Sequence, residues 1–132
     1  MLYQKSLIIT GTGFLLPYMY FMRTMPLYFS RLLLIQGITT ILFWYDPIKS
    51  RNTIVHKIDS ILARMNIASY IAYKMFIYKK NIGGFSVNTF LMLYFFYLSH
   101  KYSTVEWGCE LHLFCHGTAH ILSYYSIYLA LI

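Results

Sequence analysis

Residues 107–132 read WGCELHLFCHGTAHILSYYSIYLALI, and this apolar stretch is the most informative part of the chain. It carries three histidines spaced four residues apart, His112, His116 and His120, just after Glu110. Four residues advance a helix by about one turn and rotate it by about 40°, so the three side chains lie along one stripe. Ionisable side chains are rare in membrane-crossing segments and usually mark a functional site there. The stretch therefore predicts a membrane helix that carries a candidate site.

The composition of the whole chain favours an integral membrane protein. Of its 132 residues, 58% are hydrophobic and only 11% are charged, and a soluble domain of this size with so few charges would expose large apolar patches. The formal net charge is +7, but the basic residues are scattered among apolar blocks and form no cluster with interleaved aromatics. They fit cations that flank membrane spans, so we expect the lipid bilayer as partner and no nucleic acid.

The apolar blocks predict an all-α fold: one membrane domain over residues 1–132, a bundle of about five helices with four or five spans. The expected helices cover residues 7–22, 26–45, 54–78, 85–99 and 104–132. Gly11 and Gly13 would allow close helix contact in the first, and Pro17 would kink it. Residues 43–45, Phe-Trp-Tyr, would leave the second helix at headgroup level, where aromatic side chains gather.

The third segment decides the topology, because Arg64, Asn66 and Lys74 interrupt it. If all five segments cross, the basic residues divide six against five: Lys5, Lys49, Arg51, Lys57, Arg64 and Lys101 against Arg23, Arg31, Lys74, Lys79 and Lys80. If the third lies on the surface, Lys74, Lys79 and Lys80 join the first side and Lys101 leaves it, giving eight against three. The charge bias favours four spans. Only five spans put residues 46–60 and the start of the last helix on one side, and we prefer that arrangement.

The histidine stripe predicts a metal site formed by two of its members. Histidines four residues apart can bind one ion, whereas three along a straight helix span about 12 Å, too far for a single ion. His116 and His120, nearest the middle of the segment, are the expected pair, and zinc is the expected metal. His112 or His56 is the candidate third nitrogen. The same side chains could instead hydrogen-bond neighbouring helices or water.

A second pair of chemical groups, His56 and Asp59, lies at helical spacing near the start of the third segment. Asp59 could be a metal ligand, could orient a ligating imidazole, or could be the catalytic base acting on a bound water. The alternative is a structural role, in which Asp59 or Ser60 caps the third helix.

Asp59 near the start of one helix, with His116-x3-His120 on the last, resembles the membrane metal-hydrolase superfamily of alkaline ceramidases and progestin/adiponectin receptors. That family combines a Ser-x3-His motif, an aspartate on the following helix and a His-x3-His pair on its final span. The resemblance implies a zinc ion, an aspartate-assisted water and hydrolysis of a lipid amide. Asn52 stands where a serine four residues before His56 would be required, and the chain has room for five spans rather than the family's seven.

Two functions remain open at this point. The first is an intramembrane His/Asp metal site that hydrolyses a lipid amide. The second is a non-catalytic accessory or structural subunit of a membrane assembly, or a viral membrane protein, whose histidines contact other membrane subunits. Haem ligation would require histidines at similar depth on two facing helices, and we expect His100 at the end of the fourth helix and His56 in a loop.

Overall fold

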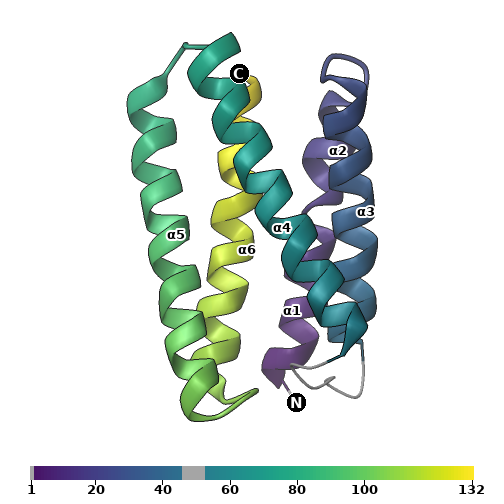
Figure 1. Ribbon diagram of the computed structural model, residues 1–132, viewed down its shortest axis with the longest axis vertical. Helices are drawn as coiled ribbons and strands as arrows, with labels where there is room; N and C mark the ends of the chain where they lie inside the picture. The colour runs from purple at the N-terminus through teal and green to yellow at the C-terminus, as the bar shows by residue number, and fades with distance from the viewer. Residues whose placement is uncertain (1, 46–52) are drawn as a thin grey trace.

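The computed structural model describes residues 2–45 and 53–132, and the side chains from residue 5 onward. In this part of the chain the elements are α1 (Leu2–Thr12), α2 (Leu15–Phe21), α3 (Leu27–Trp44), α4 (Ile54–Ala72), the π-helical turn η1 (Tyr73–Ile77), α5 (Ile82–Val105) and α6 (Glu110–Leu131). Because α1 and α2 form one broken helix and η1 continues α4, the described residues form an all-α bundle of five helices (Figure 1). Lys49, Arg51 and Asn52, used in the sequence argument, lie outside the described residues.

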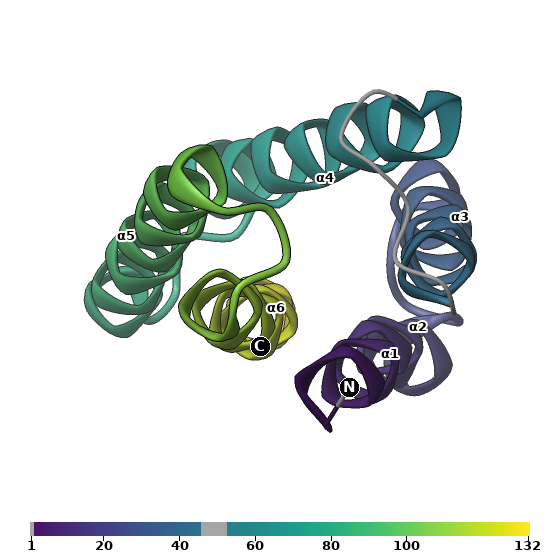
Figure 2. The ribbon, with the colours of Figure 1, turned by 90° about the horizontal axis from the view of Figure 1, so that it is seen from below.

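The helices form two groups, α5 with α6 and the α1–α2 helix with α3 and α4, and the groups meet where α1 and α4 contact α6. Helix α5 packs along α6, α3 packs on α4, and α1 contacts both α3 and α6. Seen along the bundle, α5, α4 and α3 follow one another in an arc, with α6 and the α1–α2 helix on the other side (Figure 2). Helix α4 crosses the bundle obliquely from its lower end to its upper end (Figure 1).

The first helix breaks before Pro17, as the proline predicts. Proline has no N–H to donate to the carbonyl four residues earlier, which here belongs to Gly13. The chain turns at residues 13–14 instead, where the Leu16 N–H donates to Gly13 O at 3.1 Å. Gly11 and Gly13 also permit close contact: a Cβ on Gly11 would lie 2.8 Å from Thr40 Cγ2, and one on Gly13 would meet the Tyr124 ring. The small residues thus bring α1 against α3 and α6.

The core contains a large apolar cluster and polar bonds between helices. Phe29, Leu33, Tyr70, Met92 and Ile127, from α3, α4, α5 and α6, are all buried. Burial of aromatic and aliphatic side chains is the main stabilising contribution in such a core when water is the reference.

Two of the three aromatic residues expected to leave α3 at headgroup level are covered by the rest of the bundle. Phe43 and Trp44 are buried at 1% exposure each, and only Tyr45 is exposed. Trp44 stacks on Trp107, with ring centroids 6.5 Å apart and planes 14° apart, and Phe43 contacts both tryptophans. We call Phe43, Trp44 and Trp107 the aromatic cluster. It joins the end of α3 to the α5–α6 turn.

The boundary between the last two helices differs from the expectation of residues 85–99 and 104–132. Helix α5 continues through His100 and Lys101 to Val105. Polar side chains near the end of a bundle do not by themselves end a helix. The turn comes later, at Gly108, whose φ of 84° suits glycine. Cys109 then caps α6 by accepting the His112 N–H on its sulfur.

Two helices of the described residues are long and apolar enough to cross a membrane by length and composition, α3 and α5. Four or five spans were expected, so length and composition support fewer crossings than the sequence reading did. The finding is compatible with a membrane location and is weak support for it.

Candidate functional site

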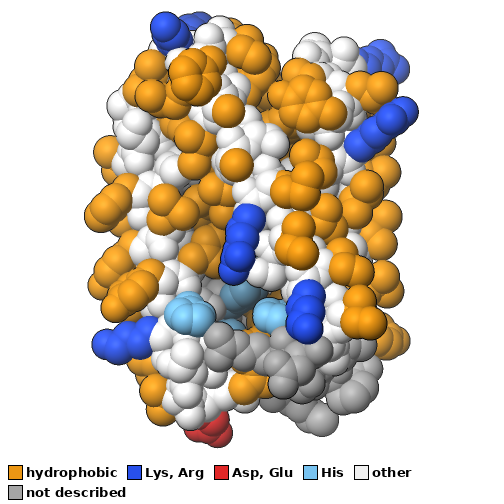
Figure 3. All heavy atoms as spheres, viewed as in Figure 1, with side chains coloured by type: hydrophobic (Ala, Val, Ile, Leu, Met, Phe, Trp, Pro, Cys, Tyr) orange, Lys and Arg blue, Asp and Glu red, His pale blue; other side chains and the backbone are white. Residues whose placement is uncertain are grey.

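A cavity of about 410 Å³ lies between α4, α5 and α6, within the range of small-molecule sites. All five histidines of the chain line it, together with Asp59, Ser60, Arg64, Ser99, Ser103 and Ser123. Viewed from the side, histidine side chains are visible in a hollow with Lys and Arg side chains around it (Figure 3). Residues from distant parts of the sequence therefore converge on one polar cavity.

The histidine stripe of α6 faces this cavity as the spacing predicts. The rings of His112 and His116 lie 5.9 Å apart between centroids, and those of His116 and His120 lie 4.6 Å apart in an edge-to-face arrangement. His112 and His120 are buried, at 2% and 3% exposure. Glu110, at the first position of α6, is exposed and does not line the cavity.

The Nδ1 atoms of His112 and His120 contact different kinds of group. His112 Nδ1 accepts the backbone N–H of Gly108 at 3.1 Å, so the neutral ring carries its proton on Nε2. His120 Nδ1 lies 3.4 Å from Thr10 Oγ1, and the Thr10 hydroxyl donates to Leu7 O at 3.2 Å. Thr10 therefore accepts from His120 Nδ1–H, which leaves a lone pair on His120 Nε2. The local structure thus prepares His120, and not His112, to accept a proton or bind a metal through Nε2.

Asp59 lies inside α4 and is buried at 6% exposure, so the alternative in which it caps the third helix is wrong. The cap is Thr53, whose side chain accepts the His56 N–H at 3.3 Å. Gln36 Nε2 and Thr40 Oγ1, both from α3, donate to Asp59 Oδ1 at 2.9 and 2.7 Å. Buried carboxylates require such partners, and these two fix the orientation of the carboxylate. Ser60, the other candidate cap, lines the cavity instead.

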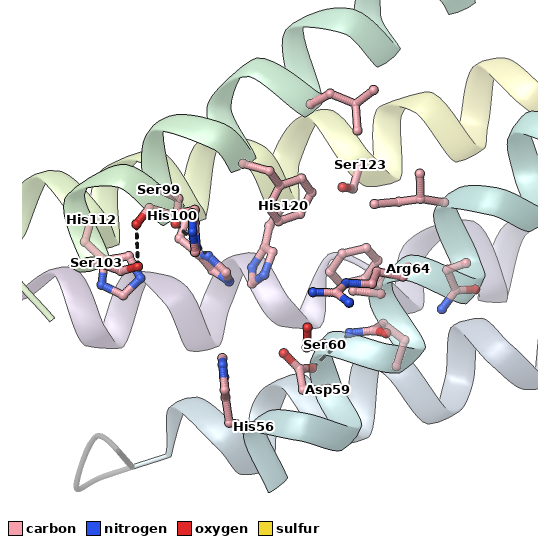
Figure 4. Close-up of a pocket in the computed structure, with 18 of the residues that line it drawn as sticks. His56, Asp59, Ser60, Arg64, Ser99, His100, Ser103, His112, His120 and Ser123 are labelled. Atoms are coloured by element: carbon pink, nitrogen blue, oxygen red, sulfur yellow. Dashed lines mark hydrogen bonds between the residues drawn. The ribbon is translucent and has the colours of Figure 1, made fainter. Parts of the chain in front are cut away.

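His56 enters the same cavity from the first turn of α4, so the expectation that it lies in a loop is wrong. Its ring packs between two members of the aromatic cluster, 4.8 Å from Phe43 and 5.4 Å from Trp107 by centroid. Trp107 also lies 4.8 Å from the ring of His112. The aromatic cluster therefore packs against both His56 and His112. These two histidines lie toward the same end of the cavity (Figure 4).

Sequence reasoning missed Ser99, which is 3% exposed and lies 3.0 Å through its Oγ from His116 Nδ1. At this distance His116 could activate the Ser99 hydroxyl as a base. The Ser99 hydroxyl could equally orient the His116 imidazole. Gln36 and Thr40 were missed as well. No local pattern distinguishes these residues from other polar residues of apolar helices, because their partners come from other helices.

A zinc site requires several donor side chains close together. Within residues 2–45 and 53–132, no three His, Cys, Asp or Glu side chains are grouped closely enough to hold one metal ion. A structural or catalytic zinc needs at least three protein ligands. The donors present in this arrangement do not fit zinc, since His112 presents a protonated Nε2 and the third donor would have to come from α4.

Comparison of the chain with protein-family models, with curated proteins and with solved structures finds no match.

Proposed function

We propose that this chain is a small multi-pass membrane protein whose cavity hydrolyses a lipid amide by acid–base chemistry. The observation that carries the proposal is the convergence of Asp59, on α4, with His116 and His120, on α6, around one cavity. The resemblance of these three residues to the membrane metal-hydrolases supports the same reaction class.

Two features support a membrane location with more crossings than composition alone indicates. Many large apolar side chains are exposed around the bundle, among them Phe76, Tyr20 and Phe90 at 82%, 76% and 71% (Figure 3). Exposed apolar surface of this extent suits lipid rather than water. The oblique path of α4 from one end of the bundle to the other favours five crossings over a third segment that lies on the membrane surface (Figure 1).

In the proposed reaction His120 is the general base. Its Nε2 lone pair removes a proton from water as the water oxygen attacks the amide carbonyl carbon. The same proton then passes to the amide nitrogen, the C–N bond breaks, and a carboxylic acid and an amine are released. Asp59 is the one acidic residue among the described residues that line the cavity, and its negative charge stabilises the cationic imidazole formed on proton transfer. His120 and Asp59 face the cavity from opposite walls (Figure 4).

The proposed reaction does not require zinc, and the test below measures whether zinc is bound. His116 and His120 are the pair that a metal would have to use, and a third donor, His56 or Asp59, would have to move toward them.

The test is amide hydrolysis by the purified full chain in lipid nanodiscs, with N-acyl lipids as substrates and bound zinc measured on the same samples. We expect His120→Gln and Asp59→Asn each to lower kcat/KM by at least about 100-fold, the scale of a lost general base. Glu110→Gln, the same carboxylate-to-amide change at an exposed site outside the cavity, is the matched control and should leave turnover unchanged. Thr10→Val should lower turnover by about 10-fold through the tautomer of His120, whereas Thr10→Ser should restore it.

Absence of turnover in the wild-type chain, or equal turnover in His120→Gln, would overturn the proposed hydrolysis. In that case the accessory-subunit reading predicts that the same variant loses assembly or stability instead. Stoichiometric zinc that is lost together with turnover in His116→Gln would replace the metal-free mechanism with the metal one.

A further inference from the structure

The cavity changes character along its length. On α4 the lining residues run from His56 and Asp59 near the start of the helix to Ile67 and Tyr70 further along. On α6 they run in the same order, from the histidines to Ile127. The histidines and Asp59 therefore lie toward one end of the cavity, and Ile67, Tyr70 and Ile127 lie toward the other, with Asn66 as a polar residue among them.

Helix α5 contributes to the same gradient with the opposite sequence order. Its lining residues begin with Leu93 and Phe96 and end with Ser99, His100 and Ser103. Because α5 runs antiparallel to α4 and α6, this reversed order also places the polar residues at the same end (Figure 1). Three helices thus build one cavity with a polar end and an apolar end.

The dimensions fit one extended chain rather than a compact solute. At about 1.5 Å per residue, His56 and Tyr70 are separated by about 21 Å along α4, and Leu93 and Ser103 by about 15 Å along α5. A volume of about 410 Å³ distributed over that length gives a cavity with a narrow cross-section. A narrow cavity with one polar end matches an amphiphile that has a single acyl chain.

The charges on the lining favour an anionic headgroup. Arg64 lines the cavity and is exposed, and none of the described acidic residues forms an ion pair with it. The carboxylate of Asp59 is already engaged by Gln36 and Thr40. In Figure 4 the Arg64 side chain extends from α4 into the cavity, toward the His120 ring. A guanidinium presents a fork of donors that matches carboxylate and phosphate.

We propose that the cavity binds a single-chain lipid with an anionic headgroup, a carboxylate or a phosphate. Arg64 binds the headgroup, and the chain lies among Ile67, Leu93 and Ile127. That this lipid is a substrate or a product rests on the proposed function, because its headgroup then lies near His120. Binding itself requires no turnover, so the two proposals can fail separately.

The experiment is equilibrium binding of three labelled lipids to the full chain in detergent micelles: palmitate, lysophosphatidic acid and the neutral monopalmitoylglycerol. We expect Arg64→Gln to weaken binding of an anionic lipid by about 10-fold and to change binding of the neutral lipid by less than about twofold. Arg31→Gln, an exposed arginine of α3 outside the cavity lining, is the matched control and should change neither. Ile127→Trp fills the apolar end and should weaken binding of all three lipids. The tighter of palmitate and lysophosphatidic acid identifies the headgroup as carboxylate or phosphate.

Equal affinity for the neutral and anionic lipids, or anionic binding that is unchanged in Arg64→Gln, would overturn the inference. Charge-selective binding without amide hydrolysis would overturn the proposed function and leave this inference standing. Hydrolysis together with charge-independent binding would do the reverse.

Discussion

Replacing Asn88 with leucine should weaken the contact between α5 and α6, the two helices that carry Ser99 and the histidine stripe. Asn88 is 8% exposed, and its Nδ2 donates to Leu122 O at 2.9 Å and to Ser126 Oγ at 2.7 Å. Hydrogen bonds between membrane helices contribute about 0.6 kcal/mol on average and at most about 1.7 kcal/mol. Two lost bonds therefore predict a free energy of unfolding lower by about 1–3 kcal/mol, since leucine keeps a similar volume.

Reversible unfolding of the purified chain in mixed detergent micelles measures this change. A double-mutant cycle of Asn88→Leu with Ser126→Ala isolates the one bond that the two side chains share, with an expected coupling of about 0.5–1.5 kcal/mol. Thr104→Ala, an exposed residue of α5 that bonds only within its own helix, should change the free energy by less than about 0.5 kcal/mol. Zero coupling in the cycle, or a fully stable Asn88→Leu, would refute the reasoning.

Two further substitutions test the fold around the site. Gly11→Ala places a methyl group against Thr40, whose hydroxyl bonds the aspartate of the site, and should destabilise the chain by about 1–3 kcal/mol in the same assay. Gly84→Ala is its control, because nothing lies within 4 Å of the added carbon, and it should be neutral or stabilising; equal effects would contradict the close contact. Lys74 is fully buried and donates to Leu129 O at 2.6 Å near the end of α6. Glutamine is shorter and cannot keep this charged hydrogen bond, so Lys74→Gln should lower the thermal midpoint of unfolding. An unchanged midpoint would show that the bond contributes nothing to stability.

The helices could be predicted from the sequence to the extent that hydrophobic blocks define them. The expected segment 26–45 matches α3, Leu27–Trp44, because Pro26 marks its start and few polar residues interrupt it. The expected segment 85–99 was too short, because it was ended at the first polar residues. In the structure these residues continue the helix near the end of the bundle. The turn is set by Gly108 and the Cys109 cap, and a sulfur cap carries little sequence signal.

The site could be predicted only where its residues follow one helix. Four-residue spacing is local information, so it placed the three histidines on one face of α6 correctly. The partners of Asp59 are non-local: Gln36 and Thr40 lie on α3 and meet it only because α3 packs along α4. The zinc expectation depended on distances between helices, which no spacing within a helix supplies.

The antiparallel order of α4, α5 and α6 is the feature that relates the fold to the proposed chemistry. Hydrolysis of a lipid requires water and an acyl chain to reach the same bond, although the two are favoured in opposite environments. If the polar residues lay at alternating ends of the three helices, the cavity would be uniformly mixed and would favour neither. In the proposed reaction, their alignment at one end would admit water beside His120 and keep the acyl chain of the lipid against apolar side chains. The reacting bond is then expected where the two parts of the lining meet, at the level of Arg64 and Ser123, both of which line the cavity there.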